Sequence, residues 1–177
     1  TSASALAWAL YLMATHPEWQ EQLAEEAQQI DGCDFAVMSK LRLSRDVFRE
    51  ALRLYPPVPM MVREATCPEQ FRGRDVKAGA QIVISPWHLH RQERLWDNPD
   101  GFDPGRWQTE NGQKCQREAY LPFSAGPRVC PGAGFAMIEG PLLLASILAE
   151  YEVIPVSGKV PVPVAHLTVR ARDGIWL

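Results

Sequence analysis

A single cysteine stands inside a loop of unusual composition, and this loop constrains the fold more than any other stretch of the chain. The loop reads FSAGPRVCPGAGFA, residues 123–136, and it places three glycines and two prolines around Cys130. Glycine widens the range of backbone conformations and proline narrows it, so the stretch before Gly132 indicates a turn with a defined conformation. An apolar helical pattern follows at about residues 132–150. Cys130 therefore precedes a helix N-terminus, where backbone N–H groups favour a thiolate.

A thiolate at this position is either a nucleophile or a metal ligand. A nucleophile normally needs a neighbouring base. The four histidines are all distant in sequence, although folding could bring one of them close: His16, His88, His90 and His166. A buried and inert cysteine is the third interpretation, because free cysteine is among the most buried residue types. The residues alone leave these three interpretations open.

Composition narrows the class of protein. A length of 177 residues predicts roughly one domain, and 46% hydrophobic residues can supply a core. The net charge of −3 argues against a nucleic-acid partner, which a basic patch would indicate. The four cysteines form no CxxC pair and no secretory signal is visible, so neither a disulfide framework nor a zinc site is expected. A reducing compartment follows from the same pattern.

Hydrophobic periodicity predicts four main helices and one short helical piece. They cover about residues 1–14, 17–30, 44–55 and 132–150, with the short piece at 35–40. Thr15 and Glu18 form a candidate capping box for the second helix, and the DGCD stretch at 31–34 ends it. The first helix is apolar on nearly every side, which is typical of a buried helix. Its apolar run is too short to cross a membrane.

The remaining segments predict short strands and a long loop. Strands are expected at 61–65, 71–73 and 81–85, and a β-like tail at 159–177. Residues 86 to about 130 show little periodicity, and a long ordered loop of this kind is usually functional. The fold class is therefore mainly α with a small β region. Because the first helix begins at residue 1 with no leading polar segment, we expect the chain to be the C-terminal part of something longer.

Two further motifs accompany the cysteine loop. Glu50 and Arg53 lie three residues apart in REALRLYPP and so share a helix face. Arg106 lies in GFDPGRWQ, between proline and tryptophan in an irregular segment, and needs an acceptor if it is buried. Glu50 is one possible acceptor. The alternative for Glu50 and Arg53 is a surface ion pair worth well under about 1 kcal/mol.

Together, the three motifs resemble those of the cytochrome P-450 family of haem-thiolate monooxygenases. FSAGPRVCPG matches the family's haem-loop pattern of Phe, Gly, Arg, Cys and Gly, and EALR matches its Glu-x-x-Arg motif. FDPGRW is similar to its Phe-x-Pro-x-Arg segment, with Gly105 where Glu is common, so only Arg106 carries over. The resemblance covers all 177 residues in order. It implies the C-terminal portion of a single haem domain at residues 1–177.

The resemblance implies a role for each residue of the loop. Cys130 would be the axial ligand of a haem iron, and thiolate donation of this kind favours O–O cleavage. Gly126 and Gly132 would let backbone N–H groups approach the sulfur and tune its donation. Phe123 would shield the same side of the haem. Arg128 would bind a haem propionate through a charge-assisted hydrogen bond.

Other segments receive implied roles in the same way. Arg63 resembles a second propionate partner, although a solvated strand arginine is the alternative, and His90 with Arg91 would help to position the propionates. Glu50, Arg53 and Arg106 would form a structural ion network behind the haem loop. The full implied haem-binding set is Cys130, Arg128, Arg63, Phe123, Gly126, Gly132 and His90.

Thr1 resembles the oxygen-side threonine of the family's long central helix. The acidic residue and glycine-containing kink that normally precede it are not in this sequence. Thr1 is the implied catalytic residue, with its hydroxyl holding a water on the proton path to O2. In PPVPMMV, the candidates for the substrate pocket are Val58, Met60 and Met61.

The implied activity is haem-dependent monooxygenation of a small organic substrate. It would use haem b, O2 and electrons from a ferredoxin or a flavoprotein reductase, with no nucleic-acid partner. The alternatives are a haem-thiolate peroxygenase or isomerase, or an inactive truncated fragment. The helices are more similar to those of soluble bacterial members of the family, which predicts a cytoplasmic protein.

Overall fold

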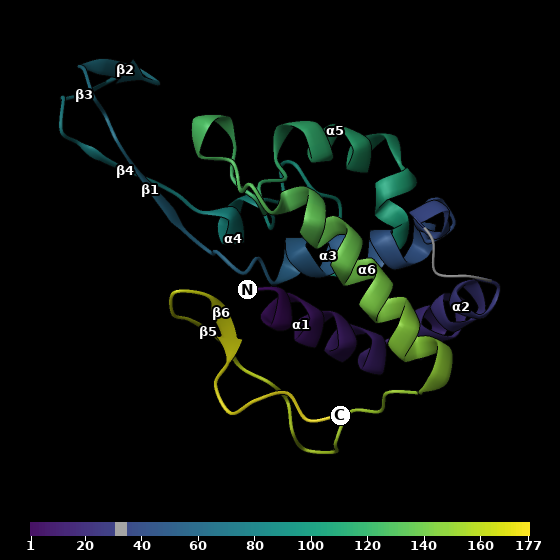
Figure 1. The fold of residues 1–177 in the computed structure, drawn as a ribbon. Helices are drawn as coiled ribbons and strands as arrows, with labels where there is room; N and C mark the ends of the chain where they lie inside the picture. The colour runs from purple at the N-terminus through teal and green to yellow at the C-terminus, as the bar shows by residue number, and fades with distance from the viewer. Residues whose placement is uncertain (31–34) are drawn as a thin grey trace.

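Four helices form the core of the computed structural model, which describes residues 1–30 and 35–177. They are α1 (Ser2–Thr15), α2 (Pro17–Gln28), α3 (Arg42–Leu54) and α6 (Ala133–Glu150), and the short helical piece is η1 (Phe35–Ser39). α6 crosses the other three main helices and packs against each of them (Figure 1). The buried side chains of these helices include Trp8, Met13, Leu23, Phe48 and Leu144. The main helices match the four predicted ones, with ends that differ by at most two residues.

The junction between α1 and α2 differs from the predicted capping box. Thr15 Oγ1 lies 3.0 Å from the carbonyl oxygen of Tyr11 and 3.2 Å from that of Leu12, so it bonds back to its own helix. His16 occupies the N-cap position of α2 and makes no side-chain cap, while Pro17 opens the helix. The capping-box prediction is therefore wrong, because the Thr15 hydroxyl has nearer acceptors behind it. The DGCD stretch at 31–34 lies outside the described residues.

α3 starts two residues earlier than predicted because another helix caps it. The Glu26 carboxylate of α2 accepts hydrogen bonds from the backbone N–H groups of Leu43 and Ser44, at 2.8 and 3.1 Å. Those N–H groups have no partner within their own helix. α3 stops at Leu54, followed by Tyr55 and two prolines that cannot continue it. The broad buried face of α3 runs from Ser44 to Leu54.

Three two-stranded antiparallel sheets make up the β structure of the described residues. β1 (Met61–Glu64) pairs with β4 (Gln81–Ile84), β2 (Glu69–Phe71) with β3 (Arg74–Val76), and β5 (Pro163–Ala165) with β6 (Val169–Ala171). The strand expected at 71–73 is instead the tip of the β2–β3 hairpin. Arg72 and Gly73 have φ of 50° and 73°, the positive values that a tight hairpin turn requires. The tail forms the β5–β6 hairpin, and Val169 N–H donates to Pro57 O at 2.9 Å.

The segment predicted as one long loop contains four short helices. They are α4 (Pro86–Leu89), η2 (Pro104–Gln108), α5 (Glu110–Glu118) and η3 (Gly126–Arg128). The sequence ENGQKCQRE of α5 has almost no apolar residues, so periodicity could not predict it. Its N-cap is Thr109, whose Oγ1 accepts the Gly112 N–H at 3.0 Å.

α6 is long and apolar enough to cross a membrane by length and composition alone. Here it packs on α1, α2 and α3, which accounts for one face of it. Gly140 allows the closest approach: a Cβ at this position would lie 2.2 Å from Phe48 Cζ of α3. Pro141 lies within the helix and is buried. The chain just after α6 is attached to α2 through Gln20. The side-chain amide of Gln20 accepts a hydrogen bond from the Val153 N–H at 2.7 Å and donates one to the Val153 carbonyl at 3.1 Å.

Candidate haem-thiolate site

The Cys130 loop is closed by backbone hydrogen bonds. Cys130 N–H donates to Phe123 O at 2.8 Å, and Val129 N–H donates to Gly126 O at 3.0 Å. Gly126 has φ of 69° with no neighbour near its missing side chain, so the turn requires glycine for its backbone conformation. Ala133 N–H then donates to Cys130 O at 3.2 Å, which leads the chain into α6. The loop therefore presents the Cys130 side chain at a helix start, with the cysteine exposed.

Cys130 lines a pocket of about 880 Å³. The start of α1, strand β1, the cysteine loop and the first turn of α6 form its walls. Most of the lining is apolar: Pro57, Val58, Met61, Val62, Pro122, Phe123, Phe135 and Ala136. This volume lies within the usual range of about 300–1,000 Å³ for cofactor and ligand pockets. The Cys130 thiol is thus a soft donor atom in the wall of a largely apolar cavity.

Two guanidinium groups line the same pocket. Arg63 Nη2 donates to Ser124 Oγ at 2.8 Å, and its Nη1 donates to the carbonyl of Val62 at 2.9 Å. Arg128 lies two residues before the cysteine and is exposed. An apolar cavity with a thiol and two arginines fits the chemistry of haem b, which combines an apolar ring, an iron and two carboxylates. Arg63 and Arg128 could bind the carboxylates, and Cys130 could ligate the iron.

The other sequence-predicted pocket residues divide between two cavities. Thr1, Phe123 and Gly132 line the large pocket, and a Cβ on Gly132 would lie 3.9 Å from Cys130 Sγ. Of the three candidate substrate residues, Val58 and Met61 line it as well. Met60 does not, and it lines a separate cavity of about 170 Å³ against the β5–β6 hairpin. The prediction for Met60 is therefore wrong, because its side chain lies against the β5–β6 hairpin and not in the large pocket.

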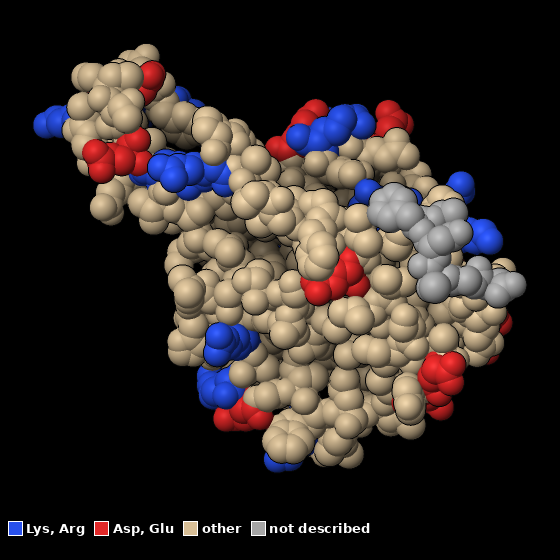
Figure 2. Space-filling view, in the orientation of Figure 1, with Lys and Arg blue, Asp and Glu red and all other residues tan. Residues whose placement is uncertain are grey.

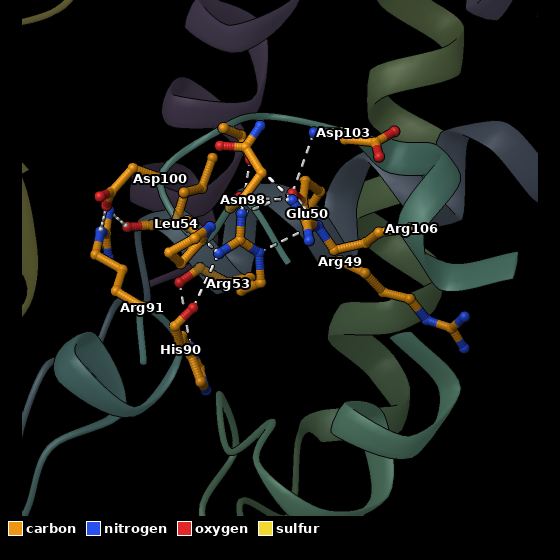
Figure 3. A network of polar contacts seen from close by, with 12 residues as sticks. Arg49, Glu50, Arg53, Leu54, His90, Arg91, Asn98, Asp100, Asp103 and Arg106 are labelled. Atoms are coloured by element: carbon orange, nitrogen blue, oxygen red, sulfur yellow. Dashed lines mark hydrogen bonds and ion pairs between the residues drawn. The ribbon is translucent and has the colours of Figure 1, made fainter. Parts of the chain in front are cut away.

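Glu50, Arg53 and Arg106 converge into one buried network (Figure 3). Glu50 Oε1 lies 2.8 Å from Arg53 Nη2 and 2.8 Å from Arg106 Nε, and it also accepts the Asp103 N–H at 3.2 Å. Glu50 and Arg53 are fully buried and Arg106 is 5% exposed. The surface-pair alternative is therefore excluded for Glu50 and Arg53.

The two arginines of the network also donate hydrogen bonds to backbone carbonyl groups of the turn at residues 97–101. Arg53 donates to the carbonyl oxygens of Pro99 and Gly101, and Arg106 donates to those of Asp97, Asn98 and Gly101. The Arg53 guanidinium carbon lies 5.4 Å from the centre of the Trp96 ring. Five donors in a planar fork suit this task, which a lysine could not perform. The network attaches the irregular segment before α5 to α3.

His90 does not join the pocket. The side chain is fully buried, with Nδ1 3.1 Å from Arg53 O and Nε2 2.8 Å from the Leu121 N–H. Arg91 bonds to the carbonyls of Leu54 and Trp87 and to the Asp100 carboxylate. The expectation that His90 and Arg91 position the propionates is therefore not supported, since their polar atoms are engaged elsewhere.

Sequence reasoning missed several residues at the site. Ser124 holds Arg63 and has a positive φ of 64°, and Phe135 forms part of the pocket wall from α6. Both lie within the FSAGPRVCPGAGFA stretch, whose pattern could have indicated them. Pro57 and Val62 also line the pocket, and only the folded arrangement of β1 against the loop brings them there.

The fold and the pocket define the haem-thiolate class of protein: a helical core, a glycine-rich cysteine loop before the last helix, and a buried Glu–Arg–Arg network. The family model described as Cytochrome P450 matches residues 1–174, and the chain belongs to this family. Its members bind haem b.

The chain is similar to known cytochromes P450 along its whole length. It is 37% identical to cytochrome P450 4A10 of Rattus norvegicus and 37% identical to cytochrome P450 4A11 of Homo sapiens, in both cases over 100% of this chain. The chain spans 35% of the length of each of these curated relatives. Among solved structures, it resembles a cytochrome P450 called CYP102L1, with a TM-score of 0.89 and 32% identity, over 98% of this chain and 40% of that one.

A second solved structure is a six-coordinated cytochrome P450 from Thermus thermophilus. It has a TM-score of 0.80 and 30% identity, and covers 99% of this chain and 43% of that one. These likenesses confirm the predicted fold class, mainly α with a small β region.

Proposed function

We propose that the protein carrying this chain is a haem-thiolate monooxygenase that inserts one oxygen atom of O2 into a small organic substrate. The observation that carries the proposal is Cys130 in the wall of an 880 Å³ apolar pocket, together with Arg63 and Arg128. Membership of the cytochrome P450 family supports it. A redox partner, either a ferredoxin or a flavoprotein reductase, would deliver the electrons; cytoplasmic location stays a prediction.

The chain's residues would divide the work of binding and proton transfer. Cys130, as thiolate, would ligate the iron, and Arg63 and Arg128 would hold the carboxylates. Haem, when bound, would supply the oxygen chemistry, and thiolate ligation would favour O–O cleavage. Thr1 lines the same pocket, and its hydroxyl would hold a water that delivers protons. Val58 and Met61 would contribute apolar contacts to the substrate.

The test is the absorption spectrum of the reduced, CO-bound, full-length protein. We expect a thiolate-type spectrum that Cys130→Ala abolishes. Cys67→Ala and Cys115→Ala are matched controls, because Cys67 is exposed in the turn between β1 and β2 and Cys115 is buried with its thiol bonded to Leu95 O. Retention of the thiolate spectrum in Cys130→Ala would contradict the proposal.

Thr1 has its own test in the same protein. Thr1→Ala should keep the haem and its thiolate spectrum but divert electrons to peroxide. The measurement is the ratio of product formed to electrons consumed. An unchanged ratio would remove Thr1 from the proton path, and it would leave the ligand assignment of Cys130 intact.

A further inference from the structure

His90 is a buried titratable side chain that the proposed chemistry does not use. Its Nδ1 faces the carbonyl oxygen of Arg53 at 3.1 Å and its Nε2 faces the N–H of Leu121 at 2.8 Å. A carbonyl oxygen only accepts and an amide N–H only donates. Nδ1 must therefore carry the proton and Nε2 must be bare, so the ring is neutral and its tautomer is fixed. Burial is the main cause that lowers the pKa of His90 to about 3.

The two partners of the ring belong to α3 and to the segment that leads into the Cys130 loop. Arg53 lies in α3 and pairs with Glu50, and its guanidinium donates in turn to His90 O at 2.9 Å (Figure 3). Leu121 lies two residues before Phe123, whose carbonyl closes the Cys130 loop at 2.8 Å. The imidazole thus forms a direct link from α3 to the entry of the cysteine loop.

A second hydrogen bond runs beside this link. Tyr120 Oη donates to the carbonyl of Arg49 at 3.0 Å, one turn earlier in α3 than Arg53. The Tyr120 ring lies 5.3 Å from the imidazole, centre to centre, and the Trp96 ring lies edge-on at 6.4 Å. Adjacent residues 120 and 121 are therefore attached to α3, one directly and one through the imidazole, and two neighbouring rings restrict the rotation of His90.

We propose that His90 is a positioning residue that fixes the Cys130 loop, and with it the sulfur, relative to α3. The hydrogen bond from Leu121 N–H to His90 Nε2 is the contact that does so. Its consequence for the iron rests on the proposed function, in which Cys130 would ligate the iron. Its consequence for the loop does not, because it concerns backbone contacts within the chain.

Two substitutions separate the two ends of the imidazole. The amide of glutamine reaches the place of Nε2, so His90→Gln keeps an acceptor for the Leu121 N–H. The amide of asparagine reaches only the place of Nδ1, so His90→Asn keeps the donor to Arg53 O and loses that acceptor. Both variants replace an aromatic ring by an amide, which makes each a control for the loss of packing in the other.

The first measurement is hydrogen exchange of the amides at 121–130 in the full-length protein without haem. His90→Asn should raise exchange of these amides by about fivefold, the effect of losing one hydrogen bond worth about 1 kcal/mol. His90→Gln should stay near the wild type. The second measurement is the reduced CO spectrum of the haem-bound protein. His90→Asn should lose part of the thiolate-type form, and His90→Gln should retain it.

Equal loss of loop protection in both variants would overturn the proposal, because it would show that the ring acts only through packing. No change in His90→Asn would overturn it as well. If His90→Asn does not fold, His90→Gln alone decides: wild-type exchange and spectrum support the link, and a released loop contradicts it. Failure of the proposed function is distinct, because it appears as a thiolate spectrum that survives Cys130→Ala while the exchange results stand.

Discussion

The buried charged side chains of α3 have partners both within the helix and far away in the sequence. Glu50 is fully buried and accepts from two arginines and the Asp103 N–H. Removing one member of such a set leaves the others desolvated without compensation. The cost of a substitution here therefore measures the isolated charge that remains, more than the strength of a contact.

Glu50→Gln is expected to destabilise the fold by about 3–5 kcal/mol. Arg53 and Arg106 would lose their shared anion while they stay buried. Urea unfolding of the full-length protein measures the change, with the exposed Glu21→Gln as control. The double variant Glu50→Gln with Arg106→Met should cost less than the sum of the single changes. A Glu50→Gln variant as stable as the control would refute a structural role for the network.

The lowered pKa of His90 makes the stability of the fold depend on pH. Its pKa is lowered from 6.5 to about 3, chiefly by burial and further by the positive charges of Arg53 and Arg91. The unfolded chain binds a proton below a pH of 6.5 and the folded chain does not, so stability rises with pH in this window and is lost as pH falls through it. The loss approaches about 1.4 kcal/mol per pH unit between these values.

His90→Gln removes this titration. The stability advantage of the wild type over His90→Gln should therefore shrink as pH falls from about 6 to about 4. Chemical denaturation at both pH values measures it, and carboxylate titrations cancel in the difference. A pH-independent difference would mean that the imidazole is accessible to protons in the folded state.

At the scale of elements, the N-terminus of α3 is capped by a side chain of another helix. The N-terminus of α3 has no side-chain cap of its own and receives the Glu26 carboxylate from α2. A carboxylate at this place satisfies unpaired N–H groups and complements the positive end of the helix dipole. Since α3 also carries Glu50 and Arg53, this cap supports the helix on which the buried network is built.

Glu26→Ala should destabilise the protein by about 1 kcal/mol, the usual cost of losing an N-cap. Glu25→Ala is a matched control on the same helix, because Glu25 is exposed. Thermal or urea unfolding distinguishes them, and the amides of Leu43 and Ser44 should exchange faster in Glu26→Ala alone. Equal effects of the two substitutions would assign the loss to helix propensity.

For the molecule as a whole, a large apolar surface is open to solvent. Phe135, Leu142 and Leu143 project from α6 with exposures of 67%, 41% and 42%, and the face of α1 and α6 in Figure 2 carries few charged side chains. Val58 and Val62 add to it around the pocket. Exposed apolar surface of this kind favours association.

Residues 1–177 expressed alone should therefore associate or stay loosely packed, and bind haem weakly without turnover. Light scattering after size-exclusion chromatography and binding of a hydrophobic dye measure the first property, and haem titration measures the second. Leu142→Glu with Leu143→Glu should reduce association. A soluble monomer that melts cooperatively and holds one thiolate-bound haem would contradict this expectation.

The sequence by itself determined the elements and motifs whose signals are local. The four main helices follow from apolar periodicity, and Cys130, Glu50, Arg53 and Arg106 follow from short motifs, because a few neighbouring residues specify each of them. The polar helix α5 and the β2–β3 hairpin were not predicted from the sequence, since neither shows a strong hydrophobic pattern.

Only the tertiary structure decided which distant groups meet. It capped the start of α3 with Glu26 of α2, and it placed Met60 in a separate cavity. It also placed His90 between Arg53 and Leu121, where a carbonyl and an N–H 68 positions apart fix one tautomer. Hydrogen-bond partners of buried polar groups are set by chain packing across the fold, which no local pattern encodes.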